Sequence, residues 1–563
     1  MILQRNFNFI PDKTVELLFM SGSDRPLLEE RGEEPTEEIS HDLSDLEDDS
    51  AVHSPDIRPT NTPLEGQWSR RSQRIAVCAV TAIISAGVVI AAVLLTQNSS
   101  SPVLADEKKS LIMMVSDGMG IASLTMARSF HQYAQGLPFD RPLNLDAYLL
   151  GSSRTRSTDS LVTDSAAGAT AFSCAQKSYN GAISVLPNHS LCGTVLEAAK
   201  RAGYMTGLVV TTRITDATPA CFNSHVDHRE KEDDIALQQV GGSPLGLVTD
   251  LMVGGGRCHF IPRETDGSCR GDSKDVVSIA KSRGFTYISD REGFDKAKSD
   301  GVSLPLLGLF AGDNIPFDVD RDPSVYPSLA EMAQLALELL TTATKDNEKG
   351  FFLMIEGSRI DHAGHANDPK AQVHEVLAYD EAFSHVLTWL DRNPGAVVST
   401  SDHETGGLST ARQIGPEYPE YLWLPEVLAN ASKSTESLAK IVTTGISNDD
   451  IKEQILHEGL GIEDASDEEM SALHKVSSDT EATRNLLSDM LSQRAQIGWS
   501  THGHSGVDVP VFFHSTSKAT NRELRSRPQL LGNHENTEVG QFLQDYLQLN
   551  TDEVTKLLNN GSG

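Results

Sequence analysis

The stretch at positions 161–170 holds a serine whose surroundings suit chemistry on phosphate. Ser165 directly follows Asp164 and opens a run of small residues, Ala-Ala-Gly-Ala. Thr163, Asp164 and Ser165 all suit the residue that caps a helix N-terminus, so a helix is expected to begin here. Free backbone N–H groups and the positive end of the helix dipole would then face the serine. The stretch predicts a site that holds a phosphate or presents an attacking hydroxyl, or else a plain helix start.

Polar residues follow each of four apolar segments, at 111–115, 205–212, 351–355 and 396–400. Uninterrupted apolar segments of this length are typical of strands buried on both faces of a sheet. In such sheets, ligands bind beyond the carboxyl ends of the strands, so we expect the polar residues to meet at one rim. They are Asp117, Asp216, Thr218, Glu356, Asp402 and His403.

Two further groups of residues could complete a metal site. Asp361 and His365 are four positions apart, so they would share one face of a helical turn and can bind one zinc ion. His502 and His504 precede an apolar segment at 509–513. For each group alone, a surface pair or a satisfied hydrogen-bond network is the usual explanation. Together, however, carboxylates and imidazoles are the ligands that magnesium and zinc need side by side.

Helical segments separate the predicted strands, for example at 329–342 and 373–390. Buried strands that alternate with helices indicate an α/β fold with a mainly parallel sheet. The stretch at 411–496 is acidic and helical in pattern, with helices expected at 449–460 and 479–491. Two interpretations are open. The stretch forms a surface subdomain that covers part of the site or part of a dimer surface, or it is a solvated helical insertion without a direct function. The last residues, 551–563, are interpreted as an exposed tail open to proteases.

The charge of the chain excludes one class of partner. Its 563 residues carry a formal net charge of −32, which would repel the phosphates of nucleic acid. Residues 1–69 are expected to be a disordered acidic tail, because half of 29–50 is Glu or Asp and that segment has no aromatic residue. Within the tail, an acidic dileucine pattern at 24–30 indicates either a sorting signal or two leucines without a role.

An uncharged segment at 75–95 is long enough to cross a bilayer. Arg70, Arg71 and Arg74 precede it, and no Arg or Lys follows closely. The positive-inside rule therefore places the tail in the cytosol and the chain beyond a 96–108 linker on the other side of the membrane. Because the segment lies too far along the chain for a cleaved signal peptide, we expect a single-pass anchor.

Five cysteines lie beyond this anchor, in a compartment where disulfides form. Their number is odd, so at least one stays free or pairs with another chain, and six cysteines in all do not make a disulfide scaffold. Cys258 and Cys269 flank a polar, glycine-containing loop and are the most plausible pair. The glycosylation acceptors on this side are Asn98, Asn188, Asn430 and Asn560.

Taken together, these segments resemble the alkaline phosphatase family. The matching motifs occur in the family's order across about residues 109–550, as Val-Ser-Asp-Gly-Met-Gly from 115, Thr-Asp-Ser-Ala-Ala-Gly from 163, Ile-Glu-Gly from 355, Thr-Ser-Asp-His-Glu-Thr-Gly-Gly from 400, and the late histidine. The resemblance implies a three-layer sandwich in which helices flank a central, mainly parallel sheet. It also implies hydrolysis of a broad range of phosphate monoesters through a phosphoserine on Ser165.

The resemblance further implies two zinc ions and one magnesium ion per subunit. One zinc falls on Asp361, His365 and His504, the second on Asp117, Asp402 and His403, and magnesium on Asp117, Thr218 and Glu356. For the late ligand, His504 is preferred to His502 because it directly precedes Ser505 and stands at the family's distance from 509–511.

Four more site residues follow from the resemblance. Arg229 lies where the family places its phosphate-binding arginine, and Asp164 can orient it. An arginine suits phosphate because its planar fork donates two parallel hydrogen bonds. Asp216 resembles the family's acidic residue that holds magnesium-bound water, where many animal members have His. His362 stands where some bacterial members have Lys. This mixture of patterns leaves the magnesium dependence and the pH optimum open.

Partners and location are implied in the same way. Family members are commonly homodimers, and the tail and anchor are similar to those of members in fungal vacuoles, which predicts a vacuole-membrane protein with a lumenal catalytic domain. The rival interpretations are a phosphodiesterase or nucleotide pyrophosphatase of the same superfamily, a sulfatase, and a membrane-tethered binding protein. Sulfatases need a modifiable Cys or Ser followed by Pro and Arg, which Ser165-Ala-Ala lacks, and the pyrophosphatases usually use Thr. A damaged ligand set would favour a binding protein, yet every expected position is filled.

Overall fold

The computed structural model describes residues 108–518, 520–521 and 530–560. The predicted acidic tail, the predicted membrane segment at 75–95 and residues 96–107 of the predicted linker lie outside these residues. Within them, no helix combines the length and the apolar character that a membrane crossing requires.

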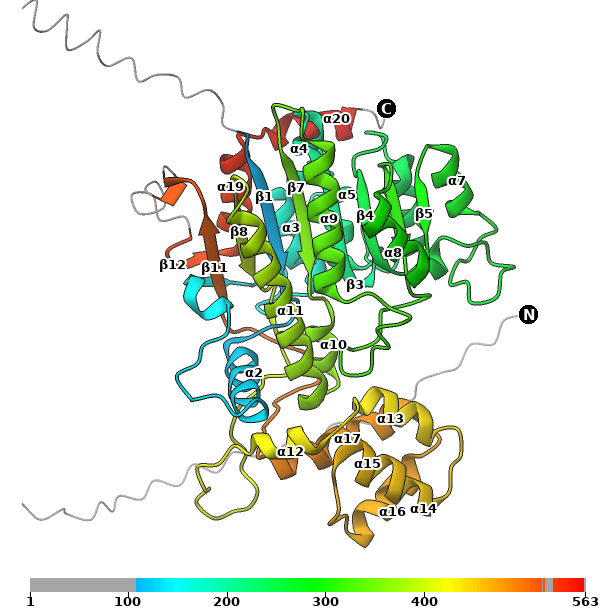
Figure 1. The fold of residues 1–563 in the computed structure, drawn as a ribbon, viewed down its shortest axis with the longest axis vertical. Helices are drawn as coiled ribbons and strands as arrows, with labels where there is room; N and C mark the ends of the chain where they lie inside the picture. Colours follow the sequence, from blue (N-terminus) through cyan, green and yellow to red (C-terminus); the bar gives the residue numbers. More distant parts are fainter. Residues whose placement is uncertain (1–107, 519, 522–529, 561–563) are drawn as a thin grey trace, which may run out of the picture. The chain divides into compact units, whose positions relative to one another are not determined.

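Ten strands form one sheet in the order β12-β2-β11-β8-β1-β7-β3-β4-β6-β5 (Figure 1). Their bounds are β1 Ser110–Val115, β2 Leu149–Arg154, β3 Met205–Arg213, β4 Leu251–Gly255, β5 Thr286–Ile288, β6 Leu306–Leu309, β7 Phe351–Glu356, β8 Gly395–Thr400, β11 Val509–Ser515 and β12 Gly532–Glu535. Only the pairings that involve β11, with β8 and with β2, are antiparallel. The mainly parallel sheet predicted from the sequence is therefore confirmed.

Both faces of the sheet are covered at its central strand, β1. All six residues of β1 are buried, with Ile112 and Met114 in one hydrophobic cluster and Leu111 and Met113 in another. Because successive side chains of a strand point to opposite faces, each cluster forms one layer between the sheet and its helices. Figure 1 shows α9 and α11 packed along the strands on the near face.

The helices divide between the two clusters, which confirms the three-layer sandwich. The first cluster includes residues of α2 Ile121–Ala134, α8 Arg291–Asp300, α9 Leu329–Ala343 and α11 Pro369–Leu390. The second includes residues of α3 Ser165–Cys174, α4 Val195–Arg201, α5 Ala217–Asn223, α6 Glu232–Leu237, α7 Val276–Ser282 and α19 Asn536–Leu547. The helices predicted at 329–342 and 373–390 correspond to α9 and α11.

The four strands predicted to carry polar residues at their ends are neighbours, in the order β8-β1-β7-β3. All three pairings between them are parallel, so their carboxyl ends meet at one edge. Short elements extend that edge: α10 Arg359–His365 follows β7, and the two-residue strands β9 Glu404–Thr405 and β10 His504–Ser505 pair with each other. The predicted rim therefore exists.

The stretch at 411–496 is helical, as predicted. It contains α12 Pro425–Asn430, α13 Thr435–Val442, α14 Asn448–Asp450, a π-helical segment Ile451–His457, α15 Glu458–Leu460, α16 Asp467–Val476 and α17 Thr480–Ala495. Leu428, Leu438 and Leu491 belong to the same buried cluster as residues of α2 and α11. The insertion is therefore packed onto the sandwich rather than solvated on all sides.

The expectation of an exposed C-terminal tail was wrong for 551–560. These residues form α20 Thr551–Asn560, whose Val554 and Leu558 are buried against Ala198 of α4. Thr555 Oγ1 also accepts a hydrogen bond of 2.8 Å from the Gly193 N–H. The two apolar side chains are four positions apart, so they share one face of the helix, and that face covers α4.

Two disulfides form among the described cysteines. Cys258 pairs with Cys269, as predicted, and Cys174 pairs with Cys192. Cys221 remains a free, buried thiol, which agrees with the odd number of cysteines.

Candidate active site

Ser165 is the first residue of α3, and Asp164 caps that helix. Asp164 Oδ1 accepts a hydrogen bond of 3.0 Å from the Ala167 N–H. Ser165 is only 3 % exposed, and its Oγ lies 3.0 Å from Nε2 of His403. The stretch at 161–170 therefore contains the N-terminus of α3. This helix places the Ser165 hydroxyl beside the imidazole of His403, which follows β8.

A glycine permits this close approach of α3 to the β8 loop. A Cβ atom at Gly168 would lie 2.9 Å from the Cβ of Asp402, inside the normal contact distance of two carbon atoms. The small-residue run after Ser165 thus has a structural purpose, because it lets the helix lie directly on the residues that end β8.

Three of the predicted ligands form one cluster at the ends of β1 and β8. Asp117, Asp402 and His403 each place a ligand atom within 4.8 Å of the others. His403 Nε2 lies 3.1 Å from Asp402 Oδ2 and 3.6 Å from Asp117 Oδ1. Backbone N–H groups of Gly118 and His403 hold Asp402 Oδ1, so Oδ2 is left to face the cluster.

A second cluster adjoins the first. Asp361, His403 and His504 gather their ligand atoms within 4.8 Å, and His365 lies beside them with its Nε2 3.3 Å from Asp361 Oδ2 and 3.1 Å from His504 Nε2. The structure therefore brings Asp361, His365 and His504 together. It also shows that His403 faces both clusters, since its ring stacks on that of His504 with centroids 3.5 Å apart.

Hydrogen bonds at Nδ1 orient all three imidazoles. Nδ1 of His365 lies 2.5 Å from the carbonyl oxygen of His502, and Nδ1 of His504 lies 2.7 Å from that of Thr163. Nδ1 of His403 lies 3.2 Å from the Thr405 hydroxyl. A carbonyl can only accept, so Nδ1 of His365 and His504 carries a proton. In the neutral imidazole this leaves the lone pair on Nε2, which is the atom that a metal ligand offers.

The rest of the predicted magnesium set lies at the ends of β7 and α5. Glu356 is 1 % exposed and accepts a hydrogen bond of 2.7 Å from the Ser358 hydroxyl. The hydroxyl of Thr218 is buried and has no hydrogen-bond partner among the described residues. Asp117 Oδ1 and Asp402 Oδ2 are buried without one as well. Such atoms cost free energy unless something else binds them.

Electrostatics at the site also fit a bound cation. Burial raises the pKa of Glu356 to about 8. Burial and the nearby carboxylates of Asp402 and Asp361 raise the pKa of Asp117 well above its usual range. For Asp361, burial acts the other way and is outweighed by His365 and His504, which lower its pKa. Crowded buried carboxylates beside imidazole nitrogens are a donor set for divalent metal ions.

Arg229 reaches this site from the loop after α5. Its Nη1 lies 3.3 Å from Asp164 Oδ2, as the sequence led us to expect, and its Nη2 lies 3.0 Å from Asp216 Oδ1. Asp216 also contacts Arg213 at 3.1 Å. Against the effect of burial, the two arginines lower the pKa of Asp216 to about 2. Asp216 is thus engaged by arginines, whereas the sequence-based hypothesis gave it a role toward magnesium-bound water.

His362 lies one residue from Asp361 but points to a different partner. Its Nδ1 accepts a hydrogen bond of 3.3 Å from Nε of Arg359. Burial and the Arg359 charge lower the pKa of His362 to about 4, so this imidazole is neutral at physiological pH. The structure therefore places it beside the site and not among the clustered ligand atoms.

Sequence reasoning missed residues that hold the ligands. Thr405 Oγ1 donates to Asp361 Oδ1 at 2.5 Å and contacts His403 Nδ1, so one hydroxyl joins both clusters. A signal was present, because Thr405 is two positions after His403 and alternate residues of an extended segment share a face. The carbonyls of Thr163 and His502 gave no such signal, since every residue has one.

Comparisons with known proteins agree with this geometry. The family model described as alkaline phosphatase matches residues 108–549. The chain is 51 % identical over 524 residues to the repressible alkaline phosphatase of Saccharomyces cerevisiae, covering 89 % of this chain and 91 % of that one.

Solved structures are similar as well. The cold-active alkaline phosphatase of a Shewanella species has a TM-score of 0.66 and 30 % identity, covering 78 % of this chain and 99 % of its own. A mutant alkaline phosphatase of the Antarctic bacterium TAB5, solved with magnesium bound, has a TM-score of 0.54 and 26 % identity, covering 79 % of this chain and 99 % of its own. Family and ligand cluster together indicate divalent metal ions at the site. The chain belongs to the alkaline phosphatase family.

Proposed function

We propose that this chain, an alkaline phosphatase that hydrolyses phosphate monoesters, does so through a covalent phosphoserine on Ser165. The observation that carries the proposal is the 3.0 Å contact between Ser165 Oγ and His403 Nε2, within a cluster of buried ligand atoms. Ser165 Oγ attacks phosphorus, the bond to the ester oxygen breaks, and that oxygen leaves as the alcohol. Water then attacks the phosphoserine and releases inorganic phosphate.

The proposed cofactors are two zinc ions and one magnesium ion. Asp361, His365 and His504 would hold one zinc, Asp117, Asp402 and His403 the other, and Asp117, Thr218 and Glu356 the magnesium. When bound, these ions would supply positive charge that favours the deprotonated Ser165 oxygen and stabilises the leaving oxygen. Support comes from the unpartnered buried oxygens of Asp117, Asp402 and Thr218.

Other residues of the chain bind and orient the phosphoryl group. Arg229 offers a planar fork for two nonbridging oxygens, and contacts with Asp164 and Asp216 fix the plane of that fork. The N-terminus of α3 places the positive end of its dipole at Ser165, where negative charge develops. Because Arg229 and the α3 N-terminus act on the phosphoryl group, which all phosphate monoesters share, a broad substrate range is proposed.

A chromogenic assay tests this function. Purified full-length protein should hydrolyse p-nitrophenyl phosphate, lose the activity in a chelator, and regain it with zinc and magnesium together. It should turn over bis(p-nitrophenyl) phosphate far more slowly. Faster turnover of the diester would favour the alternative, a phosphodiesterase or nucleotide pyrophosphatase.

The membrane, location and assembly predictions remain part of the proposal. The uncharged segment at 75–95, after Arg70, Arg71 and Arg74, supports a single-pass anchor with the catalytic domain in the vacuolar lumen. The exposed positions of Asn188 and Asn430 support glycosylation there. A homodimer is proposed from the family. Resistance of the membrane-bound protein to alkaline extraction, microscopy in its own cell, and light scattering after chromatography test the three points.

A further inference from the structure

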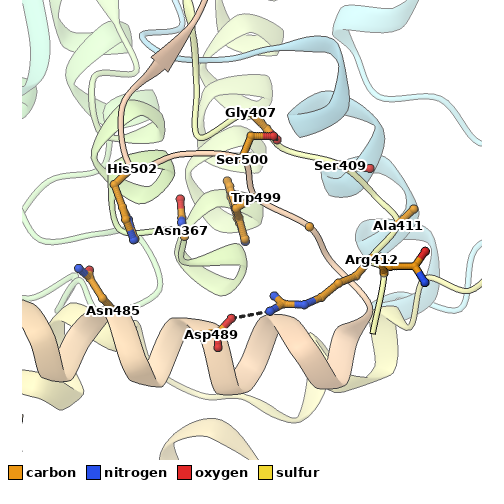
Figure 2. Close-up of a pocket in the computed structure, with 12 residues that line it drawn as sticks. Asn367, Gly407, Ser409, Ala411, Arg412, Asn485, Asp489, Trp499, Ser500 and His502 are labelled. Carbon is orange, nitrogen blue, oxygen red and sulfur yellow. Dashed lines mark hydrogen bonds and ion pairs between the residues drawn. The ribbon is translucent and has the colours of Figure 1, made fainter. Parts of the chain in front are cut away.

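A cavity of about 450 Å³ lies between the catalytic rim and α17 of the insertion. Figure 2 shows Trp499 and His502 reaching toward α17, which presents Asn485 and Asp489 from the other side. The volume is in the range of small-molecule sites. Nothing in the mechanism above uses this cavity.

The cavity begins directly outside the second ligand cluster. His502, which lines it, shares two hydrogen bonds with His365: Nδ1 of each imidazole lies within 2.9 Å of the other residue's carbonyl oxygen. His365 is the outermost of the clustered imidazoles, with 39 % of its side chain exposed. The exposed imidazole of His365 and the wall of the cavity are therefore joined through His502.

A series of contacts also connects the nucleophile Ser165 with the cavity wall. Ser165 contacts His403, His403 stacks on His504, and His504 contacts His365, whose other side joins the cavity wall. In phosphoryl transfer the leaving oxygen lies opposite the attacking oxygen. A leaving group opposite Ser165 would therefore lie toward His365, on the side of the site that His502 joins to the cavity wall.

The wall of the cavity is polar with one aromatic side chain. The indole N–H of Trp499 donates to the Ser492 hydroxyl at 3.0 Å, and its ring edge lies against Gly406, where a Cβ would come within 2.5 Å. The ring is thus fixed in place. The Asn485 amide N–H₂ and His502 Nε2 make none of the hydrogen bonds found among the described residues, so both can bind a ligand.

Among the described residues that line the cavity, none offers an unpaired positive charge for a second phosphate. Its arginine, Arg412, donates to Asp489 Oδ1 at 2.7 Å, which neutralises the guanidinium (Figure 2). An uncharged ligand is therefore favoured. Amide, carboxylate and imidazole groups suit vicinal hydroxyls, and a fixed indole suits the C–H face of a sugar-like ring.

We propose that this cavity is a leaving-group subsite that binds an uncharged, polyhydroxylated alcohol such as a sugar. The proposal rests on the phosphomonoesterase function above and specifies its preferred substrate class. Asn485 and His502 hydrogen-bond the hydroxyls and Trp499 packs against the ring. The subsite makes the hydrolysis of sugar phosphates more efficient than that of esters without hydroxyls.

The test compares kcat/KM for glucose 6-phosphate and for ethyl phosphate in the metal-loaded full-length protein. Asn485→Ala and Trp499→Ala should each lower the ratio of the two values by about tenfold, the effect of one lost hydrogen bond or ring contact. Gln454→Ala is the matched control, because Gln454 is an exposed amide of the same insertion outside the cavity, and it should keep the wild-type ratio. Asn485 is partly exposed on α17, so we expect Asn485→Ala to fold. This variant still tests the proposal if Trp499→Ala does not fold.

The outcomes separate the two proposals. Absence of hydrolysis of both esters by the wild-type protein would contradict the proposed function itself. Hydrolysis of both esters, with a ratio that stays at the wild-type value in Asn485→Ala, would overturn the subsite alone. An equal loss on both esters leaves the ratio unchanged and overturns it too.

Discussion

Ser165 Oγ and His403 Nε2 lie 3.0 Å apart although 238 positions separate them in the sequence. The contact exists because α3 begins at Ser165 and packs on the loop after β8 through Gly168. His403 in turn faces both ligand clusters. The position of the serine hydroxyl is therefore set by the same residues that would hold the metal ions.

Replacing Gly168 by Ala should displace the nucleophile. The added Cβ would lie 2.9 Å from Asp402 Cβ, so α3 must move away from the β8 loop. We expect kcat to fall by about a hundredfold, because a shift on the order of 1 Å at a reacting atom has that effect. Circular dichroism should still show a folded protein. Gly312→Ala is the control, since a Cβ there meets nothing within 4 Å, and equal activity of the two variants would contradict the prediction.

Replacing Asp164 by Asn should loosen Arg229. The change removes the charge, and at Oδ2 it substitutes an N–H₂ group for the oxygen that faces Arg229 Nη1 at 3.3 Å. Because Asp216 still holds the other side of the guanidinium, we expect a partial effect, a roughly tenfold rise in KM and in the inhibition constant of inorganic phosphate.

Asp164→Ala is the companion variant, because it also removes the cap of α3. It should lower the free energy of unfolding by about 1 kcal/mol more than Asp164→Asn, measured by urea denaturation. An unchanged inhibition constant for phosphate in both variants would show that Asp164 does not position Arg229.

Replacing Thr405 by Val should weaken zinc binding. Valine keeps the shape but removes the hydroxyl that joins Asp361 and His403. Partners that orient metal ligands contribute about 10- to 100-fold in affinity, so we expect a loss in that range, measured by competition with a chromogenic chelator. Thr405→Ser keeps the hydroxyl and should bind zinc nearly as the wild type does. A valine variant with wild-type zinc affinity would contradict this role.

Glu375 predicts how stability depends on pH. Burial, with the nearby Asp318 charge, raises its pKa from 4.5 to about 7 in the folded protein. Between these values the folded state binds more protons than the unfolded state, so the free energy of unfolding falls as pH rises from about 4.5 to 7. The fall due to this group is on the order of 3 kcal/mol at most.

Glu375→Gln isolates that effect, because the amide oxygen can still accept from the Asp318 N–H. Urea unfolding of both proteins at pH 5 and pH 7.5 gives the measurement. The wild type should lose stability relative to the variant at the higher pH. Parallel pH dependence of the two proteins would show that Glu375 titrates normally.

Much of the fold and site could be predicted because their signals are local. Apolar segments of strand length gave β1, β3, β7, β8 and β11, and the chain order of polar residues after them gave the rim. The spacing of four residues placed Asp361 and His365 on one turn of α10. Motif order supplied the rest through the family resemblance.

The remaining contacts of the site could not be predicted from the sequence because they depend on the conformations of loops. His403 belongs to both clusters because the loop after β8 meets α10 and β10. The carbonyl of His502 orients His365 because the segment before β10 meets α10. The second partner of Arg229, Asp216, follows from how the chain turns after α5. The packing of α20 was missed because a polar composition near a terminus hid two apolar residues on one face.

The most direct test of the account is to trap the covalent intermediate. The full-length protein is mixed with excess p-nitrophenyl phosphate, quenched in acid within the first turnovers, digested and analysed by mass spectrometry. The account predicts one phosphoryl group on the peptide that contains Ser165, absent in Ser165→Ala, which should also have lost monoester turnover. Full activity of Ser165→Ala, or phosphorylation of a different residue, would contradict it.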